Sequence, residues 1–130
     1  MISKKSHIKH AVIILNYCGH VDTIRCIQSV LATKDAPYII VVDNHSPDDS
    51  VAQIKQAFPA IDLIESPQNL GYAGGNNLGI KYAMSKKAQV VYLLNNDTTV
   101  DINLFFRSYR FVADKLRIAG GKIYYAKNYA

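Results

Sequence analysis

Short apolar runs alternate along the chain with longer stretches in which apolar residues recur every three or four positions. The apolar runs cover residues 11–15, 38–42, 61–65 and 90–94. Runs of this length are too short for buried helices and are typical of strands in a parallel sheet. The run at 61–65 alternates more strongly with polar residues, so we expect it near the sheet edge. Strands alternating with helices predict an α/β fold, a three-layer α/β/α sandwich with a mostly parallel sheet and right-handed crossovers.

The stretches between these runs predict helices. The first carries an apolar stripe made of Val21, Ile24, Ile27, Val30 and Leu31, which can lie on a sheet. Ser46 is the expected cap of a second helix, with Pro47 in its first turn and Asp49 completing a capping box. A third helix follows the glycine-rich segment and runs to about residue 87, and Asp101 is expected to cap a fourth. The inward-facing residues of the fourth are Leu104, Phe105, Val112 and Leu116, and residues 118–125 predict a last strand.

The run at 90–94 ends abruptly in the polar sequence Asn-Asn-Asp-Thr-Thr, as a central parallel strand does at the edge of its sheet. Asp97 and Asn95 offer hard oxygen ligands, which suit Mg²⁺ or Mn²⁺ held jointly with the phosphates of a substrate. The alternative is a polar turn that only ends the strand.

Two further runs also end in polar residues, Asn16 and Tyr17 after the first and Asp43 and Asn44 after the second. Right-handed parallel crossovers place the carboxyl ends of all strands at one edge, where open α/β sheets bind ligands. We therefore expect a crevice with Asp43 as a hydrogen-bonding carboxylate and Asp97 as a metal-binding one.

The glycine-rich segment 71–77 is expected beside this crevice as a loop whose backbone approaches a ligand closely, followed by a helix with free N–H groups. Its spacing matches neither a dinucleotide fingerprint nor a Walker A loop.

Composition places the chain among single-domain globular proteins. The net charge of +5 and the pI near 9.2 permit a polyanion, but a solvated surface is the simpler account. No nucleic-acid-binding pattern is present, so we expect no nucleic-acid partner. Residues 1–10 predict a basic tail, which would allow peripheral contact with an anionic bilayer, although no run is long enough to span one.

Two cysteines, Cys18 and Cys26, match neither a redox nor a zinc pattern. They indicate a reduced, cytosolic compartment. Cys18 and His20 are too few ligands to define a metal site, and Cys26 has the place of a small buried side chain in a helix.

Four motifs in order resemble those of family 2 glycosyltransferases with the GT-A fold, in particular the rhamnosyltransferase-like branch. They are Ala-Val-Ile-Ile-Leu-Asn-Tyr at 11–17, Ile-Val-Val-Asp-Asn-His-Ser at 40–46, Asn-Leu-Gly-Tyr-Ala-Gly-Gly-Asn-Asn at 69–77 and Leu-Leu-Asn-Asn-Asp at 93–97. The resemblance covers about residues 11–125. It implies that residues 11–130 are a nucleotide-sugar-binding domain, truncated before the acceptor-binding half.

The resemblance also implies roles for individual residues. Asn16 and Tyr17 would border the base, and Asp43 would bond the base or ribose. Asp97 would match the final aspartate of the family's D-x-D motif and bind the metal, with Asn95 in the place of the first aspartate. The nucleotide-sugar-binding residues are expected to be Asn16, Tyr17, Asp43, Asn44, Asn69, Ala73, Gly74, Asn77, Asn95 and Asn96.

By this resemblance the donor would be a UDP- or dTDP-sugar, used with Mg²⁺ or Mn²⁺ in an inverting transfer to a glycan or glycolipid. The rhamnosyltransferase-like branch implies rhamnose as the sugar. The general base is expected beyond Ala130, since Asp101 and Asp114 occupy ordinary helical positions. A nucleotide-binding domain without catalysis is the second interpretation, and a flavodoxin-like or NAD-dependent domain is a third that the glycine spacing fits poorly. A sheet that lacks its second half would expose an apolar face, so self-association is expected as well.

Overall fold

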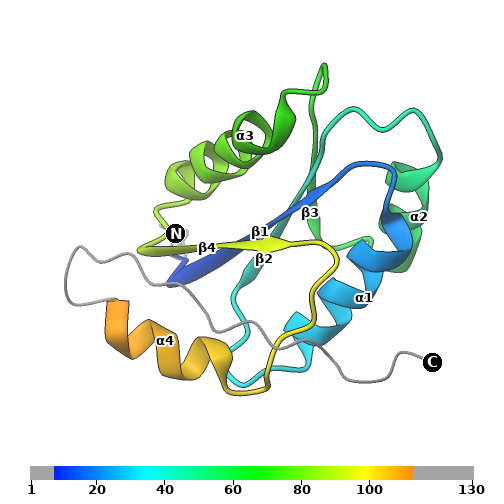
Figure 1. Ribbon diagram of the computed structural model, residues 1–130. Coiled ribbons are helices and arrows are strands. Elements are labelled where there is room, and N and C mark those ends of the chain that lie inside the picture. The colour runs from blue at the N-terminus through cyan, green and yellow to red at the C-terminus, as the bar shows by residue number, and fades with distance from the viewer. Residues whose placement is uncertain (1–7, 113–130) are drawn as a thin grey trace, which may run out of the picture.

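Four parallel strands form a sheet at the centre of the folded domain. The computed structural model describes residues 8–112. Its strands are β1 (His10–Asn16), β2 (Tyr38–Asp43), β3 (Asp62–Glu65) and β4 (Val90–Asn95), in the spatial order β3-β2-β1-β4. All three neighbouring pairs are parallel, so the carboxyl ends of the strands lie at one edge (Figure 1).

Helices cover both faces of this sheet, which confirms the predicted three-layer architecture. They are α1 (His20–Leu31), α2 (Ser50–Ala57), α3 (Gly71–Ser85) and α4 (Leu104–Val112). Residues of α1, α2 and α4 form one apolar core with alternate residues of β1 and β2, and α3 covers the opposite face (Figure 1). Residues on the two faces alternate along each strand, because successive side chains of a strand point in opposite directions.

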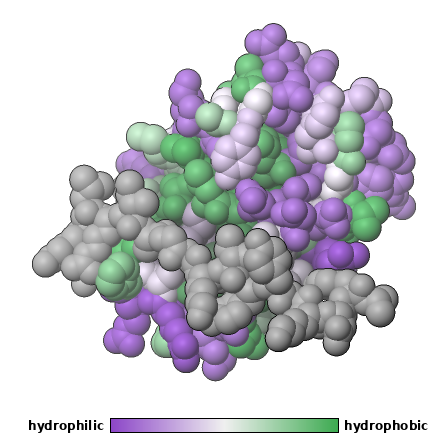
Figure 2. Space-filling view, in the orientation of Figure 1, coloured by the Kyte–Doolittle hydropathy of each residue, from purple (hydrophilic) through white to green (hydrophobic). Residues whose placement is uncertain are grey.

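The positions of the strands partly match the expectations from the sequence. β3 lies at the sheet edge, as predicted. β4, however, is not a central strand within residues 8–112, where it pairs only with β1. Figure 2 shows apolar side chains gathered over this part of the molecule, and Leu93 of β4 is 48% exposed. The predicted strand at 118–125 lies outside the described residues, and self-association through an apolar face stays a prediction.

The buried side of α1 differs from the predicted stripe. Val21 and Leu31 are 60% and 51% exposed, whereas Thr23 and Cys26 are fully buried together with two of the expected residues, Ile27 and Val30. At 3.6 residues per turn, Val21 lies about 120° around the helix from Ile27. The stripe therefore includes a polar threonine that the sequence pattern did not single out.

The start of α2 was also predicted wrongly. The helix begins at Ser50 and not at Ser46, because Ser46 donates both its backbone N–H and its hydroxyl to the Asp43 carboxylate, at 2.9 and 2.7 Å. A different residue satisfies the first turn: Asp48 Oδ1 accepts the backbone N–H of Ser50 at 3.0 Å.

The start of α4 is close to the expected one, since Asp101 accepts the backbone N–H of Asn103 at 2.8 Å. Phe105 is buried, and Leu104 packs against the same core. Leu116 lies outside the described residues.

The predicted basic tail of residues 1–10 overlaps the first strand at His10, and its residues 1–7 lie outside the described part. β1 already begins at His10, whose side chain is buried among the rings of Tyr92, Phe105 and Tyr109. In the described part of the chain, no helix has both the length and the apolar character needed to cross a bilayer.

Candidate functional site

The strand ends that carry polar residues meet at one edge of the sheet. Asn16 at the end of β1 pairs in register with Asp43 at the end of β2, and Leu15 pairs with Asn95 at the end of β4. Asp97 follows two residues later. The parallel topology thus brings together three polar segments that are far apart in the sequence.

A groove of about 310 Å³ opens at this edge. It is lined by Leu15, Tyr17, Tyr72, Asn95, Asn96 and Asp97. The side chains of Tyr17 and Tyr72 are more than half exposed, and the Tyr72 hydroxyl donates to Asn95 Oδ1 at 3.2 Å. Two aromatic rings, amides and one carboxylate in a small groove can bind a flat ring together with polar groups attached to it.

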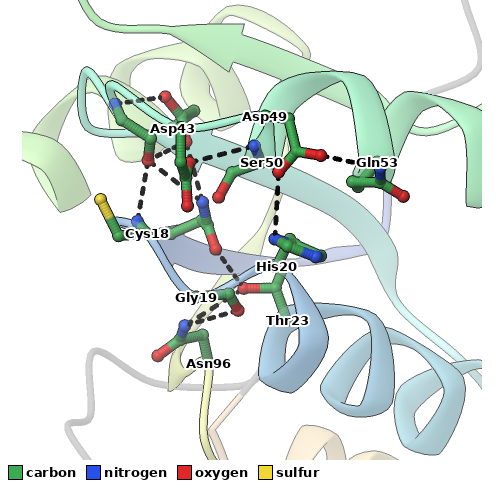
Figure 3. Close-up of polar contacts among 12 residues, drawn as sticks. Cys18, Gly19, His20, Thr23, Asp43, Asp49, Ser50, Gln53 and Asn96 are labelled. Carbon is green, nitrogen blue, oxygen red and sulfur yellow. Dashed lines mark hydrogen bonds and ion pairs between the residues drawn. The ribbon is translucent and has the colours of Figure 1, made fainter.

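Beneath the groove lies a buried polar network at the ends of β1 and β2 (Figure 3). Asn16 is fully buried and Asp43 is 2% exposed. Asn16 Nδ2 donates to Asp43 Oδ1 at 2.8 Å, and the same carboxylate accepts two hydrogen bonds from Ser46. The Ser46 hydroxyl oxygen also accepts the backbone N–H of Cys18 at 2.9 Å. These bonds satisfy the buried carboxylate and tie together the loops that follow β1 and β2.

The network continues from β1 toward β4 through Thr23. Its hydroxyl donates to Asn16 Oδ1 at 2.7 Å and accepts Asn96 Nδ2 at 3.1 Å. Asn96 Nδ2 also lies 3.5 Å from the carbonyl oxygen of Gly19. The groove residue Asn96 is thereby connected to the buried network below it.

Asn44 connects the end of β2 with the start of α3. It is 3% exposed, and its amide nitrogen donates to Asn69 Oδ1 at 3.0 Å and to the carbonyl oxygen of Gly71 at 3.1 Å. Its carbonyl oxygen accepts the backbone N–H of Leu70 at 2.9 Å, and Asn69 Oδ1 accepts that of Gly71. The start of α3, and with it Tyr72, is held close to the carboxyl end of β2.

The segment 71–77 is helical and not the expected loop, since α3 begins at Gly71. Glycines in it serve the packing of this helix on the sheet. A Cβ atom at Gly75 would lie 2.5 Å from Leu15 Cδ1, and one at Gly79 would lie 2.5 Å from Ile13 Cγ2. Only Gly71 has a positive φ, +71°, among the described glycines. The close approach predicted for a ligand is therefore, at Gly75, an approach to strand β1, and Gly79, beyond the predicted segment, approaches the same strand.

The expected site residues fall into three groups in the structure. Those that line the groove are Tyr17, Asn95, Asn96 and Asp97. Those buried beneath it are Asn16, Asp43 and Asn44. Those at the start of α3 are Asn69, Ala73, Gly74 and Asn77, of which only Gly74 is partly buried. The sequence did not single out Thr23 or Tyr72 as site residues, because their partners Asn96 and Asn95 lie far away along the chain. Leu15 was expected only as part of a strand and Ser46 only as a helix cap.

Within residues 8–112, two places offer ligands for a divalent cation. Asp97 is exposed in the groove, where its carboxylate and the neighbouring amide oxygens are the hard donors that Mg²⁺ and Mn²⁺ prefer. The second place is a cluster of His20, Asp48 and Asp49, whose ligand atoms lie within 4.8 Å of one another. Cys18 is not part of this cluster. Its candidate ligands beside His20 are therefore the two aspartates and not the cysteine.

Cys26 lies under the end of β4, where its thiol is 3.7 Å from the carbonyl oxygen of Asn95. Burial raises the pKa of the Cys26 thiol to about 11; a hydrogen bond with Thr98 opposes this shift, and the negative charge of Asp97 adds to it. Cys26 is therefore a protonated packing residue, as its helical position predicted.

A second hollow, of about 370 Å³, lies beside β3 and contains Asp62 and Tyr82. Its polar groups are already engaged, because Asp62 Oδ2 accepts the hydroxyls of Tyr38 and Tyr82, both at 2.5 Å. Burial and the Asp62 carboxylate raise the pKa of Tyr38 to about 12. This hollow includes none of the expected site residues, so the groove at the carboxyl edge is the better candidate site.

Comparisons with known proteins agree with this architecture. The model of the family described as glycosyl transferase family 2 matches residues 11–128. No curated protein matches the sequence.

Among solved structures, the mannosyltransferase PcManGT of Pyrobaculum calidifontis, in complex with GDP-Man and Mn²⁺, is similar with a TM-score of 0.71 and 19% identity. The match covers 83% of this chain and 33% of that one. TarS 1-349 of S. aureus in complex with UDP-GlcNAc is similar with a TM-score of 0.64 and 22% identity, over 81% of this chain and 31% of that one. These likenesses show the fold, and the chain spans about a third of the length of either structure.

Proposed function

Since the chain belongs to glycosyl transferase family 2, we propose that it forms the donor-binding half of a glycosyltransferase that transfers a sugar from a nucleoside diphosphate sugar. The observation that carries this proposal is the groove at the carboxyl edge of the sheet, where exposed tyrosines, amides and Asp97 line one small volume.

The groove offers a place for each part of a nucleotide. Tyr17 and Tyr72 present exposed aromatic rings, and stacking of a base on an aromatic side chain is worth about 1–3 kcal/mol. Asn95 and Asn96 supply amide groups for ribose or sugar hydroxyls. Asp43 and Asn44 lie below with their side-chain groups already hydrogen-bonded, so we assign them to holding the loops around the base. Asn69, Ala73, Gly74 and Asn77 would border the diphosphate from the start of α3.

Asp97 is the proposed ligand of Mg²⁺ or Mn²⁺, and its exposed carboxylate beside amide oxygens fits such an ion. When bound, the cation would neutralise negative charge on the departing nucleoside diphosphate. The residues of this chain hold the donor and exclude water from one side of it. Asn95 carries no charge, so we expect the cation to bind more tightly with the nucleotide than without it.

The finer features of the reaction are part of the same proposal. We propose UDP or dTDP as the nucleotide, rhamnose as the sugar, and a glycan or glycolipid as the acceptor in an inverting transfer. PcManGT and TarS were solved with GDP-Man and UDP-GlcNAc, respectively. Binding of GDP must therefore be measured beside binding of UDP and dTDP. The chain spans about a third of the length of these two structures, and we assign none of its residues as the general base for the acceptor. We therefore expect residues 1–130 to bind a donor without turning it over. We also propose that the protein is cytoplasmic and acts at the inner face of the membrane.

Calorimetric titration of the chain with UDP, dTDP and GDP, each with and without Mn²⁺, tests the proposal. We expect UDP or dTDP to bind weakly, with a Kd of about 1 mM or below, and more tightly with Mn²⁺. Asp97→Asn should abolish the effect of Mn²⁺, whereas Asp22→Asn, on the exposed side of α1, should not. Absence of binding by every nucleotide at millimolar concentration would refute the proposal. Binding that ignores Mn²⁺ would favour a nucleotide-binding domain without metal-dependent catalysis.

A further inference from the structure

Thr23 occupies a place that a ligand in the groove does not reach. Its side chain is fully buried in the first turn of α1, whereas Asn96 lies after β4, 73 residues further along the chain. The single Thr23 hydroxyl nevertheless bonds to Asn16 on one side and to Asn96 on the other. It is the link between the buried network and the groove.

The Asp43 carboxylate determines the direction of every hydrogen bond in this series. A carboxylate only accepts hydrogen bonds, so Asn16 turns its amide nitrogen toward Asp43 and its carbonyl oxygen toward Thr23. The Thr23 hydroxyl has one proton and donates it to that oxygen. Its own oxygen can then only accept, so Asn96 must turn its amide nitrogen toward Thr23. The Asn96 carbonyl oxygen points away from Thr23 (Figure 3).

We infer that Thr23 is a positioning residue, which fixes the Asn96 amide so that its carbonyl oxygen faces the groove beside Asp97. This inference rests on the function proposed above. Within residues 8–112 the hydrogen bonds of Asn96 use only its amide nitrogen, and Asn96 and Asp97 both line the groove. An oxygen acceptor beside a carboxylate suits a hydrated divalent cation, whereas the opposite orientation would present N–H donors to it.

Gly19 restricts the same amide from the other side. A Cβ atom at Gly19 would lie 2.9 Å from Asn96 Nδ2, and the φ of Gly19 is −135°, so alanine there brings no backbone strain. Gly19→Ala should therefore displace the Asn96 amide while Thr23 keeps its hydroxyl. Gly19→Ala is thus a second and independent way to disturb the orientation of the Asn96 side-chain amide.

The affinity of the UDP-bound chain for Mn²⁺, measured by electron paramagnetic resonance of free Mn²⁺, tests the inference. Thr23→Val keeps the shape of the side chain and removes the hydroxyl, and we expect it to weaken Mn²⁺ binding by about tenfold, as loss of an outer-shell partner does at metal sites. Gly19→Ala should weaken it in the same direction, and Thr23→Ser should stay within about twofold of the wild type. Val30→Ala, which loosens the packing of α1 without touching the network, should leave the affinity unchanged. Wild-type affinity in Thr23→Val, or an equal loss in Val30→Ala, would overturn the inference.

A measurement without ligand separates this inference from the proposed function. The side-chain amide of Asn96 should give an ordered NMR signal in the wild type and in Thr23→Ser, and a mobile one in Thr23→Val and Gly19→Ala. If the wild type binds neither UDP nor Mn²⁺, the proposed function fails, and this signal alone decides the role of Thr23. An equally ordered Asn96 amide in all four proteins would contradict it. Should Thr23→Val not fold, Thr23→Ala removes the same hydroxyl and is measured in its place.

Discussion

Replacing Gly79 by alanine tests whether the glycines of α3 serve packing on the sheet. The added Cβ would lie 2.5 Å from Ile13 Cγ2, with two more Ile13 atoms at 3.1 and 3.2 Å. Ile13 is fully buried in β1, which pairs with strands on both sides, so neither residue can move away cheaply. Overpacking of this kind costs about 1–3 kcal/mol, and the better helix propensity of alanine returns about 0.5–1 kcal/mol. We expect a net loss of about 1–2 kcal/mol in the free energy of unfolding.

Gly75→Ala is the matched comparison. Its Cβ would meet Leu15 Cδ1 at 2.5 Å, but this atom ends a flexible and only partly buried side chain. Rotation of Leu15 can relieve the contact, so we expect a change within about 1 kcal/mol of zero. Urea denaturation followed by circular dichroism measures both variants. Equal stability of Gly79→Ala and wild type would show that this glycine is not required for packing of α3 on the sheet. It would favour the original expectation of a loop beside the groove.

Two further substitutions test the buried polar groups. Asp43→Asn should lower the free energy of unfolding by about 1–3 kcal/mol, because in either orientation the new amide nitrogen would face a donor of Asn16 or Ser46. The exposed Asp22→Asn should change the free energy of unfolding little in the same urea titration. Equal effects of the two substitutions would contradict the stabilising role of the buried network. Burial, opposed in part by Asp35, lowers the pKa of His10 below 6.5. As the pH falls, the unfolded chain therefore binds a proton at this histidine before the folded chain does. The stability that the neutral His10 contributes is present above about pH 6.5 and is lost as the pH falls below that value. His10→Phe should therefore reduce the gain in stability between pH 5.5 and 7.5, and an unchanged difference between the two pH values would count against burial as the cause.

The sheet could be predicted from the sequence because its signal is local. The apolar runs that become β1 and β2 are buried on both faces, and a parallel order follows from the intervening helices. The side chains at the strand ends then share one edge by topology alone. Asn16, Asp43 and Asp97 were identified for this reason.

What the sequence did not reveal depends on which of several possible partners a side chain takes, and most of these partners are distant along the chain. Ser46 has the local pattern of a helix cap, but Asp43 takes its hydroxyl. The segment that starts α3 has poor helix propensity and is helical because Gly75 and Gly79 let it lie on β1. Thr23 looks like an ordinary helical residue, and only the fold brings it between Asn16 and Asn96.

We propose above that the groove at the carboxyl edge binds a nucleoside diphosphate with a divalent cation at Asp97. Paramagnetic broadening of backbone amide signals by Mn²⁺ in the presence of UDP tests it most directly. We expect the strongest broadening at residues 95–97, with weaker effects at Tyr17 and Tyr72. Broadening centred on His20, Asp48 and Asp49, or none at all, would contradict it.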